Sequence, residues 1–204
     1  MTPIAASCAV LLALLLPAAD AAAQNMFGSS DERIANEGTI GDKWMLDDGV
    51  KLATPEYPAA FADEGADVCV AIGYRIRPDG TTGDMAVLKQ WNSEKGEAEP
   101  QAGFWQAFAE SGASALGQWR FKPRPEVGSP RPTYTVATMS FKGSKGSSDP
   151  NFSSHCRITD LAAVVQQRKS DAYSRRSREK HDLERANQTG LSRGAMNEQP
   201  GRRP

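Results

Sequence analysis

The sequence predicts an α+β fold, in which helices pack on a small antiparallel sheet of three strands in the order α-β-β-α-β. Three observations carry this prediction. Apolar residues alternate over 67–77, aromatic residues recur at helical spacing over 102–119, and β-branched and aromatic residues dominate 133–141. Outside these segments the chain is polar and rich in Gly and Ser, which predicts a flexible leader and a C-terminal tail.

The N-terminus has the layout of a secretory signal peptide over 1–23. An apolar run over 4–16 is followed by Pro17 and small residues that fit cleavage after Ala23. The run is short for a membrane span, which favours a signal peptide. A signal peptide usually has a Lys or Arg before the apolar run, and this sequence has none. We therefore expect export with cleavage, and an uncleaved membrane anchor stays open as the alternative.

Residues 24–53 show no clear period and are expected to form an irregular leader. The domain is expected over 54–142. It begins with a brief helix between Pro58 and Gly65, because proline suits the start of a helix and glycine its end.

The two strands that follow are expected to form a hairpin, over 67–77 and 82–91. One face of the first strand is apolar (Val68, Val70, Ile72, Tyr74 and Ile76), so this face should pack on a core while Arg75 lies on the solvent side. Pro78-Asp79-Gly80 favours a turn, since proline presets φ, aspartate bonds its own backbone and glycine tolerates positive φ. Turn chemistry therefore accounts for Asp79 without a catalytic role.

The helix over 102–119 contains Gly112 and Gly117, each costing it roughly 1 kcal/mol, so it should depend on packing against the sheet. A proline-rich loop leads to the third strand. Residues 143–158 resemble a linker, and 159–204 form a basic, partly helical or disordered tail. Residues 168–204 carry ten Lys or Arg and five Asp or Glu, so the remainder has a net charge of −6. An acidic domain argues against nucleic acid as its partner.

The chemical inventory indicates a non-enzymatic protein without a metal, cofactor or small-molecule substrate. The only histidines, His155 and His181, follow the predicted domain, so no Ser-His or Cys-His site is expected in its core. The carboxylates Asp63, Glu64 and Asp67 fit a helix end. After signal cleavage two cysteines remain, Cys69 and Cys156, and a disulfide and two free thiols are both compatible with the sequence.

Several short motifs stand in order around the predicted elements: Pro55-x-Tyr57-Pro58, Pro78-Asp79-Gly80, and Trp119-Arg120-Phe121-Lys122-Pro123. Together they resemble the C-terminal domain of TonB, the periplasmic energy transducer of Gram-negative bacteria. The resemblance covers 55–141, under half of the chain. It implies a periplasmic protein with a small α/β peptide-binding domain.

The resemblance also implies a site and a partner. In that family an extended segment of a TonB-dependent outer-membrane transporter pairs beside the last strand. Here the corresponding residues are Thr133, Tyr134, Thr135, Val136, Ala137, Thr138, Met139, Ser140 and Phe141. An edge strand offers unpaired backbone groups to an extended peptide of an envelope protein, or to a second copy in a homodimer.

Two departures from the family bear on energy transduction. The apolar N-terminal run is short, and 24–53 contains no proline, so the long proline-rich spacer is missing. Two alternatives stay open: a transducer anchored in the inner membrane, and an envelope assembly factor that acts through its basic tail.

Overall fold

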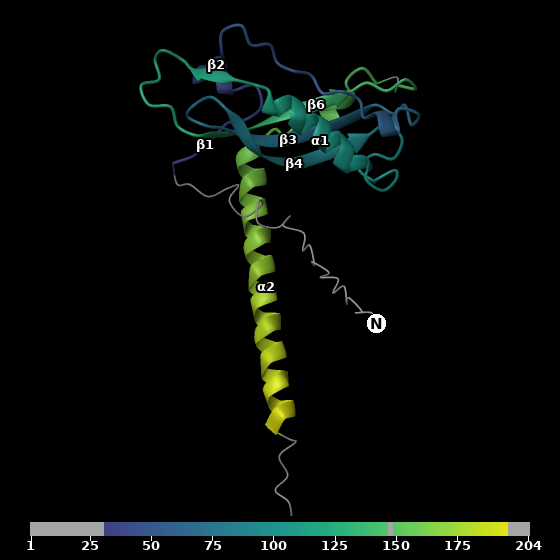
Figure 1. Ribbon diagram of the computed structural model, residues 1–204, viewed down its shortest axis with the longest axis vertical. Coiled ribbons are helices and arrows are strands. Elements are labelled where there is room, and N and C mark those ends of the chain that lie inside the picture. Colours follow the sequence, from purple (N-terminus) through teal and green to yellow (C-terminus); the bar gives the residue numbers. More distant parts are fainter. Residues whose placement is uncertain (1–30, 147–148, 196–204) are drawn as a thin grey trace, which may run out of the picture.

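The computed structural model describes residues 31–146 and 149–195, so the predicted signal peptide lies outside the described residues. Figure 1 shows a compact head from which one long helix projects. The elements in chain order are β1 (Arg33–Ile34), η2 (Ile40–Asp42), β2 (Trp44–Leu46), η3 (Ala59–Phe61), β3 (Val68–Ile76), β4 (Thr82–Asn92), α1 (Phe104–Gly117), β5 (Phe121–Pro123), β6 (Thr133–Phe141), η4 (Phe152–Cys156) and α2 (Leu161–Ala195).

The main sheet has four strands in the order β1-β6-β3-β4, and β2 pairs with β5 in a separate two-stranded sheet. β3 pairs antiparallel with β4 and β6, whereas β1 runs parallel to β6. The α+β class is therefore confirmed. The main sheet has four strands and not the expected three, because β1 was not predicted from the sequence. The leader, expected to be irregular, contributes both β1 and β2. Strands of two or three residues are too short for period-2 alternation to reveal them.

The first core lies between β3 and α1. The predicted apolar face of β3 packs here, and Phe104, Phe108 and Leu116 of α1 are fully buried against it. The Phe108 ring packs edge-on against the Phe141 ring of β6, with the two ring centroids 4.9 Å apart. The expected first helix is only the three-residue 3-10 helix η3, because Pro58 before it is extended (ψ 123°) and Gly65 follows closely at φ 64°.

A second core covers the opposite face of β3, which the sequence pattern had indicated as solvent-facing. Cys69 and Ala71 are fully buried there. The cover comes from Phe152 of η4 and from Leu161 and Val165 at the start of α2. Residues 143–158, expected as a linker, thus include a helical turn that packs on the sheet.

A disulfide between Cys69 and Cys156 joins this cover to β3. Their Cα atoms are 5.9 Å apart, and the two residues are separated by 87 positions in the chain. The disulfide was one of two alternatives left open by the sequence. It attaches η4, and with it the start of α2, to the first residues of β3.

Helix α2 continues for 35 residues, and beyond its first turns it leaves the head (Figure 1). From Lys169 to Arg185 the described side chains are exposed apart from Ala172, including Tyr173 (74%) and Leu183 (68%). Within the described residues, none of the helices combines the length and apolar character needed to span a membrane.

The motif residues make framework contacts. Tyr57 packs edge-on against Phe108 at 5.0 Å, and Trp119 donates its indole N–H to a backbone carbonyl. Gly80 has φ 80°, and its carbonyl accepts the N–H of Phe121 at 3.0 Å. A Cβ on Gly80 would lie 1.7 Å from the Phe121 carbonyl oxygen, so only glycine allows this approach. These motifs therefore assemble the hairpin, α1 and β5.

Candidate functional site

The predicted peptide-binding residues form β6 in full. On one side β6 pairs with β3 along its whole length, from Ile76 opposite Thr133 to Val68 opposite Phe141. A strand directs the N–H and C=O groups of alternate residues to opposite sides. The groups that do not bond to β3 therefore point to the outer edge of β6, where an added strand would bind.

The start of this outer edge is already occupied by β1. The Arg33 N–H donates to the Pro132 carbonyl and the Ala35 N–H to the Tyr134 carbonyl, each at 2.9 Å. The expectation that β6 is an edge strand throughout is therefore wrong: its first residues lie between β1 and β3. β1 pairs with Thr133 and Tyr134 only, so β6 after Tyr134 has no β1 residue beside it.

Further along the same edge, the Glu37 side chain takes the position of a strand. Its carboxylate accepts the Thr138 N–H at 2.6 Å and the Thr138 hydroxyl at 2.9 Å. Thr138 lies four positions after Tyr134, and residues an even number of positions apart in a strand direct their N–H groups to the same side. The Thr138 N–H therefore points away from β3. A side-chain carboxylate thus satisfies a backbone donor that a neighbouring strand would otherwise bond.

A polar groove of about 560 Å³ lies beside this position. One side is lined by Thr138 and Ser140 of β6 together with Glu37 of the leader. The other side is lined by η4 and its flanking residues (Asn151, Ser153, Ser154 and Arg157). The disulfide at Cys156 holds η4 in place. The groove therefore has a fixed wall rich in hydrogen-bonding groups next to the least covered part of β6.

The other edge of the sheet, β4, is contacted by arginine side chains at two places. Arg168 of α2 donates to the carbonyls of Val87 at 2.8 Å and Leu88 at 3.2 Å. Near the turn, Arg77 donates to the Thr82 carbonyl at 3.2 Å. The β3–β4 pairing is also interrupted by two register shifts, which twist an edge away from partners. Strand addition is therefore less favourable at β4 than at β6.

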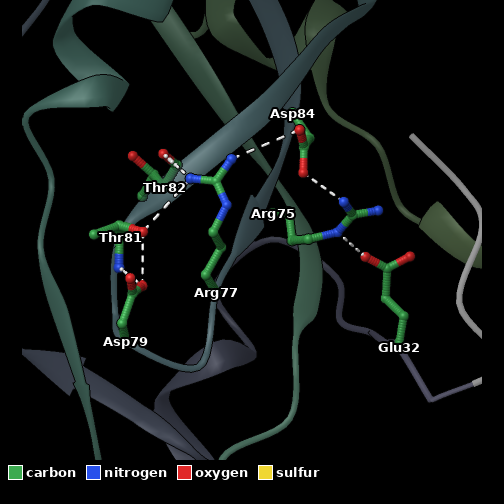
Figure 2. Close-up of polar contacts among 7 residues, drawn as sticks. All are labelled: Glu32, Arg75, Arg77, Asp79, Thr81, Thr82 and Asp84. Carbon is green, nitrogen blue, oxygen red and sulfur yellow. Dashed lines mark hydrogen bonds and ion pairs between the residues drawn. The ribbon is translucent and has the colours of Figure 1, made fainter. Parts of the chain in front are cut away.

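A half-buried charge cluster lies beside the hairpin (Figure 2). Arg75 forms ion pairs with both Glu32 and Asp84, and Arg77 lies 3.7 Å from Asp84. Arg75 is only 17% exposed and Glu32 only 7%, so the expectation that Arg75 faces solvent is wrong. The hydrogen bond that Arg75 donates to the Glu32 carboxylate is the main reason that the pKa of Arg75 is raised. With two cations and two carboxylates, the cluster ties the leader to the hairpin.

Asp79 acts as the sequence predicted. Its carboxylate accepts the Thr81 N–H at 2.9 Å and the Thr81 hydroxyl at 2.7 Å, as Figure 2 shows. These bonds from Thr81 lower the pKa of Asp79 below its usual value. The residue closes the turn.

His155 lies within the fold, contrary to the expectation that both histidines lie outside it. Its ring stacks on Trp91 of β4 with centroids 4.0 Å apart, and its Nε2 lies 3.5 Å from Asp149. The neighbouring Cys156 is in the disulfide and has no thiol to activate. Across 31–146 and 149–195, no cluster of three or more His, Cys, Asp or Glu has a metal-binding arrangement.

Sequence reasoning missed Glu37 and Arg157. Glu37 lies in the Gly- and Asn-containing leader, where no periodicity distinguishes it. Its role depends on β1, which brings the leader to the outer edge of β6. Arg157 reaches the groove only because the disulfide places η4 beside the sheet.

A scan against protein-family models and a search of the curated proteins found no match. Among solved structures, the chain is similar to the solution NMR structure of the Pseudomonas aeruginosa TonB C-terminal domain. The identity is 21%, the match covers 53% of this chain and 92% of that chain, and the TM-score is 0.38. A likeness of this size carries no argument about function, so partner and role have to be argued from the site.

Proposed function

We propose that the chain is a non-enzymatic periplasmic protein that binds an extended segment of an envelope protein by strand addition. The binding site is the outer edge of β6 from Val136 to Ser140, together with the polar groove beside it. The proposed partner is a TonB-dependent outer-membrane transporter, in keeping with the sequence motifs. The peptide would continue the line of β1 along β6.

The observation that carries this proposal is the bond between Glu37 and the Thr138 N–H. The carboxylate oxygen accepts the hydrogen bond that a peptide carbonyl would accept in an added strand. Because a side chain makes this bond, an incoming peptide can replace it without breaking the sheet. The exchange trades one acceptor for another, so the added strand gains mainly from its further backbone bonds.

The expected affinity is modest. Each net backbone hydrogen bond contributes roughly 0.5–1.5 kcal/mol, and the accessible stretch of β6 offers only a few. Side chains of the peptide can add bonds to the hydroxyl groups and to Arg157 across the groove. We expect a Kd on the order of 100 µM for a short peptide.

The test is a titration of the isotope-labelled protein with a TonB-box peptide, followed by the backbone amide resonances. Shifts should concentrate from Val136 to Ser140 and on Arg157, while the amides of β4 stay unchanged. A scrambled peptide of the same composition is the control. Shifts spread evenly over the head, or equal shifts with the scrambled peptide, would contradict the proposal.

Two variants sharpen the test. Glu37→Ala removes the competing carboxylate, so binding should tighten by roughly threefold to tenfold. Thr138→Pro removes an N–H that faces away from β3, so it should abolish binding while the β3–β6 bonds remain. Glu97→Ala, an exposed carboxylate in the loop after β4, is the matched control and should change nothing. Weaker binding by Glu37→Ala would contradict the exchange of acceptors.

The periplasmic location is supported by the signal-like N-terminus and by the buried disulfide, which persists in oxidising compartments. The alternative is a transducer anchored in the inner membrane. Mass spectrometry of the native N-terminus separates the two: a chain that begins near Gln24 has lost the anchor, whereas a chain that retains 1–23 favours the anchored form.

A further inference from the structure

A second concave site is lined by residues of β1, of β2 and of the loop that leads into β6. Figure 1 labels β1 and β2 on the left. The site is a cavity of about 380 Å³. We name it the Arg33–Lys43 cavity after two of its lining residues. Its further lining residues include Trp44, Val127, Pro130 and Arg131. Its volume falls in the range of small-molecule sites.

The walls of the cavity are held by hydrogen bonds. Trp44 is 2% exposed, and its indole N–H donates to the Thr133 hydroxyl at 2.9 Å. The Arg124 N–H donates to the Lys43 carbonyl at 2.9 Å, and this bond holds the loop after β5 against β2. A site with fixed walls loses little conformational freedom when a ligand binds.

The cationic groups of the cavity retain binding capacity. The Nη2 atom of Arg33 bonds to Asp42 at 2.7 Å, but its Nη1 atom is buried and finds no acceptor among the described atoms. Within the same residues, the Lys43 ammonium forms no ion pair, whereas Arg131 is paired with Asp31. The Arg33 side chain is 32% exposed and pairs with only one carboxylate of the described residues, so its guanidinium and the Lys43 ammonium can both pair with a bound anion.

We propose that the Arg33–Lys43 cavity binds a carboxylate carried on an apolar body. The carboxylate pairs with the Arg33 guanidinium and the Lys43 ammonium, while the apolar body packs against Val127 and Pro130. All the charged lining residues are cations. Their acidic partners, Asp31 and Asp42, are exposed and are not among the lining residues. The C-terminus of a peptide and a free organic acid share this chemistry.

This site is separate from the proposed peptide edge. Thr133, at the start of β6, lines the cavity, whereas the groove beside Glu37 begins at Thr138. Loss of binding at one site is therefore expected to leave the other intact, and the two proposals can fail independently.

The experiment titrates the full chain with N-acetylphenylalanine and follows the assigned indole N–H resonance of Trp44. We expect a Kd of about 1 mM or lower, and binding at least about tenfold weaker for the uncharged N-acetylphenylalaninamide. Equal binding of the amide, or no shift of the Trp44 resonance up to about 10 mM acid, would overturn the proposal. Displacement of the acid by an equal concentration of inorganic phosphate would also overturn it.

Substitutions test the two cations. Lys43→Gln and Arg33→Gln should each weaken binding about tenfold, and Lys51→Gln, an exposed lysine outside the cavity, should leave it unchanged. Arg33 belongs to β1, so Arg33→Gln could disturb the fold; Lys43→Gln has no ion pair to lose and decides the matter. An equal loss in Lys51→Gln would show non-specific attraction and reject the site.

Two further ligands distinguish the sources of the carboxylate. Tighter binding of acetyl-Ala-Ala-Phe than of N-acetylphenylalanine supports a peptide C-terminus. Equal binding of 3-phenylpropionate and the tripeptide supports a free organic acid. Both results support the shared chemistry. Binding of the tripeptide alone, with no response to either single acid, would reject it.

Discussion

The Cys69–Cys156 disulfide should be the largest single contribution of a side-chain link to the stability of the head. Replacing both cysteines with alanine removes the bond between the start of β3 and η4. The folded chain still places η4 on the second face of β3, because Phe152, Leu161 and Val165 remain buried there. The unfolded chain, in contrast, is released from a long closed loop.

The magnitude follows from the length of that loop. The cysteines are 87 positions apart, and the chain-entropy relation for a loop of this length gives about 4.6 kcal/mol at 25 °C. Disulfides often deliver less, because unfolded chains retain structure. We expect the double variant to lose about 3–5 kcal/mol in the free energy of unfolding.

The assay is urea denaturation followed by tryptophan fluorescence, with the oxidised wild type, the reduced wild type and the double variant compared at one pH. The reduced wild type should match the double variant. A difference below about 1 kcal/mol between oxidised wild type and double variant would refute the reasoning. Identical gel mobility of the unfolded wild type with and without reductant would show that the bond does not form.

Three more predictions follow from buried contacts. Gly73→Ala should destabilise the head by about 1–3 kcal/mol, because the new Cβ would lie 2.2 Å from the hydroxyl oxygen of the fully buried Tyr134; denaturation midpoints measure this. Burial raises the pKa of Tyr134 to about 12, so the unfolded chain ionises first. Stability should be intact below about pH 10 and fall by up to about 2 kcal/mol as the pH rises to 12, and Tyr134→Phe should flatten this loss in denaturation at several pH values. Ending the chain after Lys169 should change the free energy of unfolding by no more than about 0.5 kcal/mol, because nearly all described side chains beyond it are exposed; a larger loss in the same assay would contradict the isolated position of α2.

The longer elements could be predicted because each carries its own pattern. β3 alternates over nine residues, and α1 presents apolar residues at helical spacing over fourteen. The turn at Asp79 was predictable from turn chemistry alone. Such patterns arise because one face of each element is buried and the other is not.

The candidate site was predictable only in part. The residues of β6 were expected to bind a peptide, and the structure places them in one strand, but it also places β1 against their start. β1 has two residues, and Glu37 lies in a segment without periodicity. No local pattern could show that this part of the leader returns to β6, about a hundred positions later in the chain.

Although it left the basic tail as partly helical or disordered, the amino-acid sequence alone determined the α+β class, the β3–β4 hairpin, α1 and β6. Each of these rests on residues close together in the chain, where backbone preference and side-chain period act directly. Only the tertiary structure decided how much of the β6 edge stays accessible, that the second face of β3 is buried, and that Cys69 pairs with Cys156. These features depend on contacts between distant segments, and many distant pairings are compatible with the same local pattern.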